Sequence, residues 1–308
     1  MPNLLVSDSI AREGIEILER AGRVDVNDKI TGDELGEAIV HYDALVVRSR
    51  TRVTAGIINA GTRLRVIGRA GVGLDNIDTQ EAERRGIAVV NSPASSSVSV
   101  AEHTFGLILA LARLIPQADA SMKRGEWAKN KFMGIELSGK TLGLIGLGRI
   151  GSLVAQRAVA FGMTVLTVDP YITPDRAHTF GATLLDSLDE LLAKSDFVSI
   201  HTPLLPTTQG LIGATEFAKL KPRACLICCA RGGVVDENAL LVALESGAVA
   251  GVALDVFAQE PPGENSLVRH PRVIATPHIG AMTEEGQKRA AIEMAEQVVK
   301  CLEENGAG

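Results

Sequence analysis

Aromatic residues are scarce in this chain of 308 residues: they make up 3% of the sequence, although 46% of the residues are hydrophobic. A core with this composition consists mainly of Val, Ile, Leu and Ala. Such side chains suit strands that helices cover on both faces. Because the length is enough for two ordinary domains, we expect α/β domains.

Cysteine is rare as well, with four occurrences. Cys225 and Cys228 have the spacing of a zinc-ligand pair, but the sequence has no second pair to complete a site. The residues around them, 224–230, are small and apolar, which is typical of a buried strand with thiols as small hydrophobic groups. We therefore predict no metal site.

Neither positive charge nor long apolar runs are in excess. The formal net charge is −6, which disfavours a general nucleic-acid-binding surface. The uncharged apolar stretch at 105–112 is far too short to span a bilayer, and the first residues lack the basic start and apolar run of a signal peptide. We expect a cytoplasmic protein with no nucleic-acid and no membrane partner.

Short apolar segments alternate with helical patterns along the chain, which predicts parallel sheets. For example, a helix pattern at Thr31–Tyr42 precedes a buried strand at Ala44–Val47. A long helix from Val100 to about Arg113 is typical of a crossover between domains. A last amphipathic helix, Thr283–Glu304, is predicted to fold back on the first domain. The fold class expected is α/β, with two doubly wound parallel-sheet domains.

Residues 146–151 form a G-x-G-x-x-G pattern between an apolar strand pattern and a helix pattern. Gly146 permits a tight turn, Gly148 leaves the backbone open to a pyrophosphate, and Gly151 allows close packing of helix and strand. The amides and positive dipole end of the helix favour phosphate. Asp169 ends the next strand, where its carboxylate can accept hydrogen bonds from a ribose 2′-hydroxyl and would repel a 2′-phosphate. The sequence predicts bound NAD rather than NADP.

Arg231 follows the cysteine-containing strand and precedes two glycines. A sharp turn there would expose its guanidinium at the carboxyl edge of the sheet, where ligands bind in open α/β sheets. The planar fork of arginine matches a carboxylate. The alternative is an ordinary surface arginine on a loop.

Glu260 and His278 also follow predicted strands. A carboxylate beside an imidazole favours the imidazolium and orients the ring, which gives a proton donor and acceptor near neutral pH. Spacing alone does not show that the two side chains touch, and it leaves a structural histidine as plausible as a catalytic one.

Six motifs in order along the chain resemble the D-isomer-specific 2-hydroxyacid dehydrogenases. They are GRAGVGLDNID at 68–78, the glycine-rich segment 146–151, HTPL at 201–204, ARGGVVDENAL at 230–240, LDVFAQEPP at 254–262 and TPHIGA at 276–281. Within the family, the segments VRSRT at 47–51 and WAKNKFMG at 127–134 are most similar to the D-3-phosphoglycerate dehydrogenase subgroup.

The resemblance implies a domain organisation. A Rossmann NAD-binding domain, residues 95–282, would be inserted into a flavodoxin-like substrate-binding domain formed by residues 1–94 and 283–308, with a cleft between them. It also implies a homodimer, or a tetramer, with the helix from Val100 in the dimer interface. The sequence stops at Gly308, so the expectation is a short form without the C-terminal regulatory domain, not inhibited by serine.

The resemblance also implies roles for single residues. Arg231 would hold the substrate's carboxylate and carbonyl, His278 would be the acid–base group and Glu260 its partner. The implied cofactor-binding residues are Val72, Gly146, Gly148, Arg149, Ile150, Gly151, Asp169, Thr202, Pro203, Cys229, Ala230, Asp255, Gly280 and Ala281. The candidate substrate contacts are Arg48, Ser49, Arg50, Arg69, Val72, Gly73, Asn91 and Lys129. For the cations among them, the alternative is ordinary surface charge.

The implied reaction is NAD-dependent oxidation of 3-phospho-D-glycerate to 3-phosphohydroxypyruvate, the first step of serine biosynthesis. One alternative is a glyoxylate or hydroxypyruvate reductase, or another D-2-hydroxyacid dehydrogenase, which needs only the carboxylate clamp. A second is an NAD-binding protein like the C-terminal-binding transcriptional corepressors. Against it, we expect no added tails or low-complexity arms of the kind that such a protein uses to recruit partners.

Overall fold

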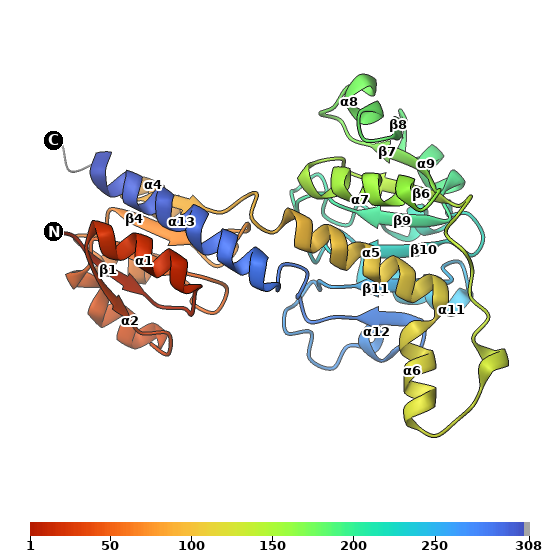
Figure 1. Ribbon diagram of the computed structural model, residues 1–308, viewed down its shortest axis with the longest axis horizontal. Coiled ribbons are helices and arrows are strands. Elements are labelled where there is room, and N and C mark those ends of the chain that lie inside the picture. The colour runs from red at the N-terminus through yellow and green to blue at the C-terminus, as the bar shows by residue number, and fades with distance from the viewer. Residues whose placement is uncertain (305–308) are drawn as a thin grey trace. The chain divides into compact units, whose positions relative to one another are not determined.

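The computed structural model describes residues 1–304 and divides into two compact units (Figure 1). Unit 1 consists of Met1–Ser96 together with the segment that begins at Ala281, and unit 2 is Ser97–Gly280. Both boundaries lie two residues from those expected from the sequence.

Unit 1 contains a sheet of five parallel strands in the order β2-β1-β3-β4-β5. This is the order of flavodoxin-like sheets, in which the strand order reverses between the first and third strands. The strands are β1 (Asn3–Val6), β2 (Arg23–Val26), β3 (Ala44–Val47), β4 (Val66–Arg69) and β5 (Ala88–Asn91). The helices are α1 (Arg12–Ala21), α2 (Gly32–Ala38), the 3₁₀ turn η1 (Ile39–His41), α3 (Ala55–Ala60), α4 (Thr79–Arg84) and α13 (Glu284–Glu304).

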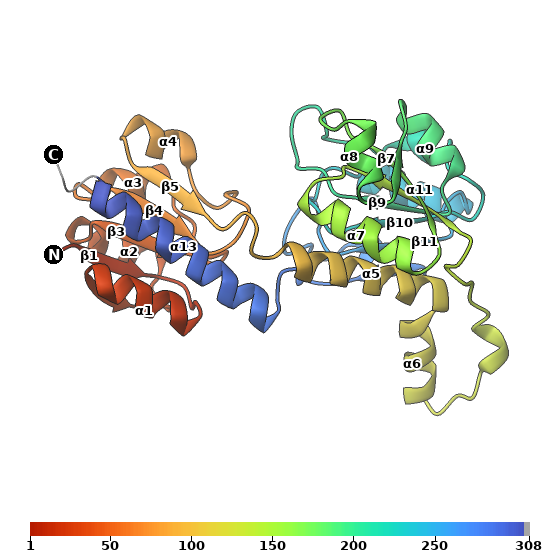
Figure 2. The ribbon, with the colours of Figure 1, turned by 45° about the horizontal axis from the view of Figure 1, so that its top comes forward.

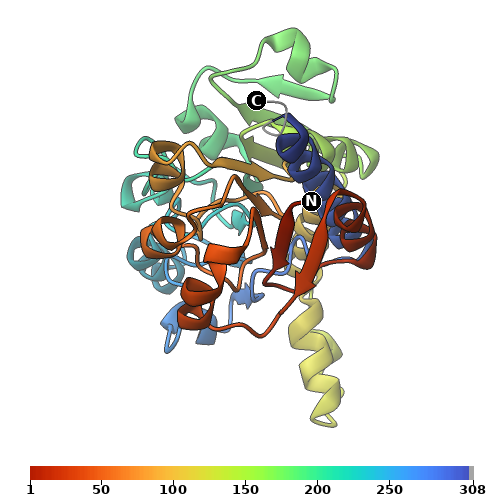
Figure 3. The same cartoon turned by 90° about the vertical axis from the view of Figure 1, so that its left-hand side faces the viewer.

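Helices cover both faces of this sheet, which explains why its central strand β3, with the sequence ALVV, is apolar throughout. Leu4 and Val6 pack with residues of α1 and α13, whereas Leu5, between them, packs with residues of α2, α3 and α4. Figures 2 and 3 show α1 and α13 side by side on one face. The side chains alternate between the faces, so every second residue of a strand enters the opposite half of the core.

Gly68 in β4 lets α13 lie directly on the sheet. A Cβ atom at this position would stand 2.5 Å from Val298 Cγ2 and 2.7 Å from Met294 Sδ, and both neighbours are fully buried. We therefore expect Gly68→Val to lower the free energy of unfolding of unit 1 by about 1–3 kcal/mol through overpacking. Urea unfolding followed by circular dichroism measures the change.

The matched control for this prediction is Gly36→Ala. Gly36 lies in α2, and a Cβ atom there meets nothing within 4 Å. This change should leave stability unaltered or raise it by roughly 0.5–1 kcal/mol. A Gly68→Val protein as stable as the wild type would contradict the close docking of α13.

Two features of unit 1 differ from the sequence expectations. The helix predicted at Thr31–Tyr42 starts after Thr31, because its side chain caps the helix in a reciprocal pair with Glu34, and a 3₁₀ turn replaces the helix after Ala38. The edge strand β2 was not predicted, because its half-exposed sequence RVDV has no apolar run.

Unit 2 contains seven parallel strands in the order β12-β11-β10-β9-β6-β7-β8. The strand order reverses between β6 and β9, and ligands of open α/β sheets bind at the carboxyl ends of the strands beside such a point. The strands are β6 (Thr141–Ile145), β7 (Thr164–Val168), β8 (Ala182–Leu184), β9 (Phe197–Ile200), β10 (Cys225–Cys228), β11 (Gly251–Leu254) and β12 (Val273–Ala275). The helices are α5 (Ser97–Arg113), α6 (Ile115–Lys123), the 3₁₀ turn η2 (Lys129–Lys131), α7 (Arg149–Ala160), α8 (Pro174–His178), α9 (Leu188–Lys194), α10 (Ala214–Phe217), α11 (Glu237–Ser246) and α12 (Ser266–Arg269). The two doubly wound parallel sheets confirm the predicted fold class.

The first two helices of unit 2 meet at a sharp bend. Leu114 has a left-handed backbone (φ 54°) between α5 and α6, and the two helix axes differ by 66°. α5 packs on the sheet, and α6 with the segment after it extends away from the rest of the unit (Figure 1). Within residues 1–304 no single helix is long and apolar enough to cross a membrane; α5 and α6 taken together would be, by length and composition only.

The cysteines of β10 are buried, as expected for a strand with small apolar thiols. Burial raises the pKa of Cys225 and of Cys228 to about 11, so both remain thiols at neutral pH. In the part of the chain that the structure describes, no group of His, Cys, Asp and Glu side chains could hold a metal ion.

Candidate active site

The glycine-rich loop of unit 2 connects β6 to α7 and has the shape that its sequence predicts. Gly146 has a left-handed backbone (φ 94°), and a Cβ atom on Gly151 would stand 2.3 Å from the carbonyl oxygen of Gly146. Gly148 caps α7, and a Cβ atom there would extend into open space. The loop therefore leaves room for a phosphate group at the helix N-terminus.

Asp169, at the end of β7, is tied to this loop. Its Oδ2 accepts a hydrogen bond from the amide of Leu147 (2.8 Å), and its Oδ1 accepts one from the amide of Tyr171 (2.9 Å). The carboxylate thus stays beside the loop, as the ribose interaction expected from the sequence requires.

Thr202, after β9, supplies independent support for a ligand here. Its Oγ1 is buried but has no hydrogen-bond partner within residues 1–304. An unpaired buried hydroxyl is costly, so a bound group that supplies the partner would be stabilised. Other predicted cofactor residues of unit 2 also lie in the segments after its strands. Arg149 and Ile150 begin α7, Pro203 follows Thr202, and Cys229 and Ala230 follow β10. Val72 and Ala281 belong to unit 1.

His201, next to Thr202, stays neutral. Burial lowers its pKa to about 4, and its Nε2 lies 2.9 Å from Ser199 Oγ. Because the folded pKa lies below the unfolded value of about 6.5, His201 contributes stability above pH 6.5 that is lost as the pH falls to 4. We expect the free energy of unfolding of unit 2 to fall less across this window in His201→Gln than in the wild type. Urea unfolding at several pH values measures both slopes, and equal slopes would contradict the prediction.

Asp255, after β11, organises the segment that carries His278. It is 1% exposed and accepts hydrogen bonds from Thr276 Oγ1 (2.5 Å) and the amides of Ile279 (2.9 Å) and Gly280 (2.8 Å). His103 Nε2, from α5, lies 3.3 Å from its Oδ1. Burial alone would raise the pKa of Asp255, but these hydrogen bonds outweigh it and lower the pKa below the ordinary value. The anionic carboxylate therefore fixes the backbone on both sides of residue 278.

His278 and Glu260, whose contact was open from the sequence, form a pair in the structure. His278 has a left-handed backbone (φ 52°) and donates its amide to the carbonyl oxygen of Asp255 (2.9 Å). Its Nδ1 lies 2.7 Å from Glu260 Oε2, and Glu260 Oε1 accepts a hydrogen bond from the amide of Phe257 (3.1 Å). Both side chains are partly exposed. With Nδ1 facing the carboxylate, Nε2 is the ring nitrogen that a ligand can reach.

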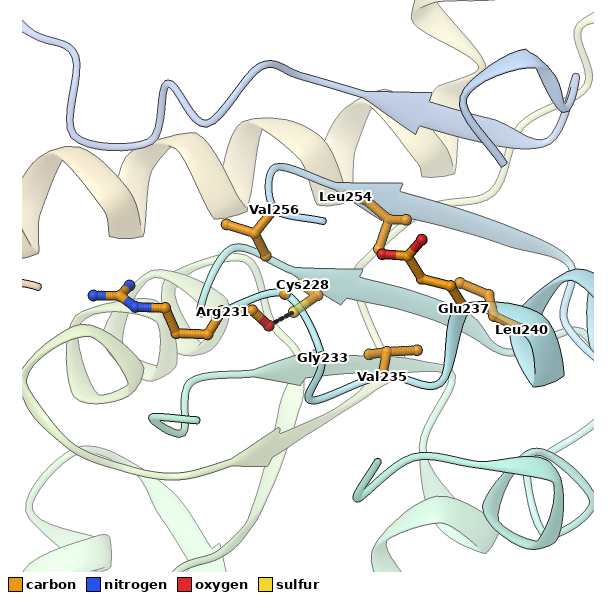
Figure 4. Close-up of a pocket in the computed structure, with 9 residues that line it drawn as sticks. Cys228, Arg231, Gly233, Val235, Glu237, Leu240, Leu254 and Val256 are labelled. Atoms are coloured by element: carbon orange, nitrogen blue, oxygen red, sulfur yellow. Dashed lines mark hydrogen bonds between the residues drawn. The ribbon is translucent and has the colours of Figure 1, made fainter. Parts of the chain in front are cut away.

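Arg231 follows β10, whose neighbour in the sheet is β11. Its Nη1 donates to the carbonyl oxygen of Ala230 (2.8 Å), and in Figure 4 its guanidinium points away from the buried residues Leu254 and Val256. A Cβ atom on Gly232 would lie 1.8 Å from the carbonyl oxygen of Phe257. The loop of Arg231 therefore packs directly on the segment of Glu260. Arg231, Glu260 and His278 follow the carboxyl ends of three adjacent strands, β10, β11 and β12.

Unit 1 carries most of the predicted substrate contacts at the carboxyl edge of its own sheet. The buried Asp8, after β1, accepts hydrogen bonds from Thr51 Oγ1 (2.6 Å) and from the amide of Arg48 (2.5 Å). Its Oδ1 also forms an ion pair with Arg50 Nε (3.0 Å). Arg50 also donates to the carbonyl oxygens of residues 7 and 30, so it joins these loops. Arg48 donates to the carbonyl oxygen of Ser9 (3.1 Å), and partial burial lowers its pKa. Strand order reverses here, between β1 and β3.

The loop after β4 lies beside this cluster. Asn91 Nδ2 donates to the carbonyl oxygen of Val72 (2.5 Å), and Asn76 Nδ2 donates to that of Arg48 (2.7 Å). Arg69 Nε donates to Asn76 Oδ1 (3.4 Å). The sheet edge thus brings together the predicted contacts of unit 1, namely Arg48, Ser49, Arg50, Arg69, Val72, Gly73 and Asn91.

Lys129 is the exception among the predicted substrate contacts. Lys129 lies in η2, which follows α6 and therefore lies past the C-terminal end of α5. Asp255, which holds the segment of His278, instead contacts α5 at His103. The ten residues from His103 to Arg113 alone correspond to about 15 Å of helix. Within one chain, the structure does not bring Lys129 to His278.

Sequence reasoning missed several residues of these clusters. Asp8 lies two residues after a strand, so the rule that located Arg231 could also have found it. His103 gave no such signal, because it lies in the middle of a helix. Asn76 and Thr276 act through hydrogen bonds that no local pattern predicts.

The chain is similar to known proteins both in sequence and in fold. Residues 105–280 match a family model described as D-isomer specific 2-hydroxyacid dehydrogenase, NAD binding domain. A protein of Methanocaldococcus jannaschii named D-3-phosphoglycerate dehydrogenase is 52% identical over 98% of this chain and 58% of its own length. The chain spans little more than half the length of the curated relatives it matches.

Solved structures show the same fold over nearly the whole chain. The TT0316 protein of Thermus thermophilus is 34% identical, with a TM-score of 0.89 over 98% of this chain and 97% of that one. D-lactate dehydrogenase of Aquifex aeolicus, determined with NAD and lactic acid, is 31% identical, with a TM-score of 0.81 over 98% and 96% of the two chains. Unit 2, with its open glycine loop and unpaired Thr202, fits the dinucleotide NAD, and the chain belongs to the D-isomer specific 2-hydroxyacid dehydrogenase family.

Proposed function

We propose that the chain oxidises 3-phospho-D-glycerate to 3-phosphohydroxypyruvate with NAD, the entry reaction of serine biosynthesis. The observation that carries the proposal is the 2.7 Å contact of Glu260 with His278 Nδ1, at the sheet edge that also bears Arg231. Relatives named D-3-phosphoglycerate dehydrogenase, about half identical to this chain, support the choice of substrate.

In this mechanism, Arg231 binds the substrate's carboxylate through its planar guanidinium. Neutral His278 accepts the proton of the 2-hydroxyl group at Nε2, while Glu260 at Nδ1 stabilises the imidazolium that forms. The glycine-rich loop 146–151 and Asp169 would hold NAD, which when bound would supply the hydride acceptor for C2. The substrate thus loses a hydride from carbon and a proton from oxygen, which leaves the ketone. In the reverse direction, protonated His278 returns its proton to the carbonyl oxygen.

Unit 1 would supply the recognition of the phosphate group. Arg48 and Arg69 are the candidates, because their cationic heads belong to the cluster at the sheet edge of that unit. Arg50 suits a test less well, since Asp8 and two carbonyl oxygens engage its guanidinium and its removal would disturb the loops.

The test measures NADH formation at alkaline pH with 3-phosphoglycerate, glycerate, lactate and malate. We expect a strong preference for 3-phosphoglycerate, and Arg48→Gln should raise KM for this substrate more than for glycerate. Activity with unphosphorylated acids alone would retain the His278 mechanism and indicate a glyoxylate or hydroxypyruvate reductase instead. NAD binding without oxidation of any acid would favour the corepressor-like alternative.

We also propose a homodimer formed through α6 and the segment after it. This arm exposes large apolar side chains, with Trp127 82% and Met133 86% exposed. Such exposure is typical of a surface that another chain covers. A partner would also allow Lys129 to act on the substrate of the second copy. Analytical ultracentrifugation should give a molecular mass of two chains for the wild type and of one chain for Trp127→Asp. A monomeric wild type would contradict the proposal.

A further inference from the structure

We propose that Glu237 is a positioning residue, which holds the segment of Glu260 against the loop of Arg231. The inference rests on the proposed function, because it assigns the relative placement of the carboxylate clamp and the acid–base pair to one side chain outside both.

Glu237 is the first residue of α11 and directly follows the loop of Arg231. Its Oε1 accepts a hydrogen bond from the amide of Ala258 (2.6 Å), and its Oε2 accepts one from Asn265 Nδ2 (3.1 Å). Ala258 precedes Glu260 and Asn265 follows it. One carboxylate at the end of the β10–α11 connection therefore accepts hydrogen bonds from the β11–α12 connection on both sides of Glu260.

A second contact makes this attachment tight. Gly232 approaches the carbonyl oxygen of Phe257 so closely that no side chain fits between them. Cys228 Sγ donates to the carbonyl oxygen of Arg231 (3.8 Å), which ties the start of the same loop to β10. The two connections are thus joined at Gly232 and at Glu237, on either side of a short turn.

Glu237 acts from behind the site and does not reach into it. In Figure 4 its carboxylate lies beside Leu254 and Leu240, and the guanidinium of Arg231 points in the other direction. The surrounding side chains, Val235 and Val256 among them, are apolar and buried. The hydrogen bond from Ala258 is itself exposed to solvent, and the one from Asn265 is partly buried.

The contacts continue from Glu237 to the reacting nitrogen. The amide next to that of Ala258 is the one of Phe257, which donates to Glu260 Oε1, and Glu260 Oε2 contacts His278. If the Ala258 amide loses its acceptor, the turn 257–260 is released and the carboxylate no longer aligns with the ring. Small misplacements of catalytic groups reduce rates strongly, so this anchor matters for the reaction.

The experiment compares Glu237→Ala and Glu237→Gln in the full chain. We expect kcat/KM for 3-phosphoglycerate to fall by up to about 100-fold in Glu237→Ala, mainly through kcat, because the binding group Arg231 is retained. Glu237→Gln should recover part of the rate, because its amide oxygen still accepts from Ala258.

The control is Glu190→Ala, which removes a first-turn carboxylate from α9, where it pairs with Lys194. It should leave both kcat and KM unchanged. A Glu237→Ala enzyme whose loss falls on KM rather than on kcat, or equals that of Glu190→Ala, would overturn the proposal. A role in stability alone would lower the unfolding midpoint without lowering kcat of the folded enzyme.

A measurement that needs no turnover separates this inference from the proposed function. The Cε1 resonance of His278, assigned by its loss in His278→Asn, reports the surroundings of the ring in the full chain. We expect its chemical shift to change in Glu237→Ala and to change less in Glu237→Gln. An unchanged chemical shift in both variants would refute the positioning role, even if the chain proves to use another hydroxy acid.

Discussion

His278→Asn should lower kcat for oxidation by about 10²- to 10⁴-fold, the usual contribution of a positioned acid–base group. Asn cannot accept a proton from the substrate hydroxyl, whereas His278 is held for this task by Glu260 at Nδ1 and by the Asp255 carbonyl at its amide. Initial rates of NADH formation at saturating substrate measure the effect. Binding of NAD, followed by the quenching of protein fluorescence, should persist.

The companion variant Glu260→Gln should also lower kcat, though by less, because the neutral amide stabilises the imidazolium poorly. His178→Asn, an exposed histidine on α8, serves as the control and should have no effect. Near-normal kcat in His278→Asn in both reaction directions would disprove the acid–base assignment.

Arg231→Lys should lower kcat/KM by roughly 100-fold although the charge is kept. A guanidinium can bind a carboxylate through two parallel hydrogen bonds, each contributing about 1.5–3 kcal/mol when charged, whereas an ammonium is a point donor. The packing of Gly232 on Phe257 sets the direction of the residue 231 backbone, so a shorter, differently shaped head cannot shift to compensate.

Steady-state kinetics with 3-phosphoglycerate over a wide concentration range would show this loss mainly as an increase in KM. Arg269→Lys, at an exposed arginine of α12, provides the control. If Arg231→Lys retained wild-type kcat/KM, the carboxylate clamp would have to be sought elsewhere.

The sequence predicted the fold well because its signals are local. Strands such as β3, buried on both faces, are short uninterrupted apolar runs, and the glycine loop before α7 has its strand, helix and acid in a fixed order. The bend at Leu114 was beyond such reasoning, because a left-handed leucine has no sequence signature. This bend directs α6 away from the sheet and separates Lys129 from the Glu260–His278 pair.

The site was predictable as a set of strand ends but not as a set of contacts. Glu260 and His278 lie 18 residues apart in separate connections, and only the adjacency of β11 and β12 brings them together. Asp255 was expected as a cofactor residue, yet its hydrogen bonds to the backbone at 279 and 280 give it a structural task that depends on tertiary packing.

The discontinuity of unit 1 has a consequence for the order of events on the ribosome. Residues 1–96 emerge first, but Leu4, Val46 and Val66 need Met294 and Val298 of α13 to cover their side of the sheet. At roughly 5–20 residues per second, synthesis of the intervening unit takes about 10 s or longer. By the end of that interval unit 2 is complete and able to fold, while the N-terminal sheet retains a bare apolar face. The nascent chain therefore has to keep this face from aggregation until α13 is made.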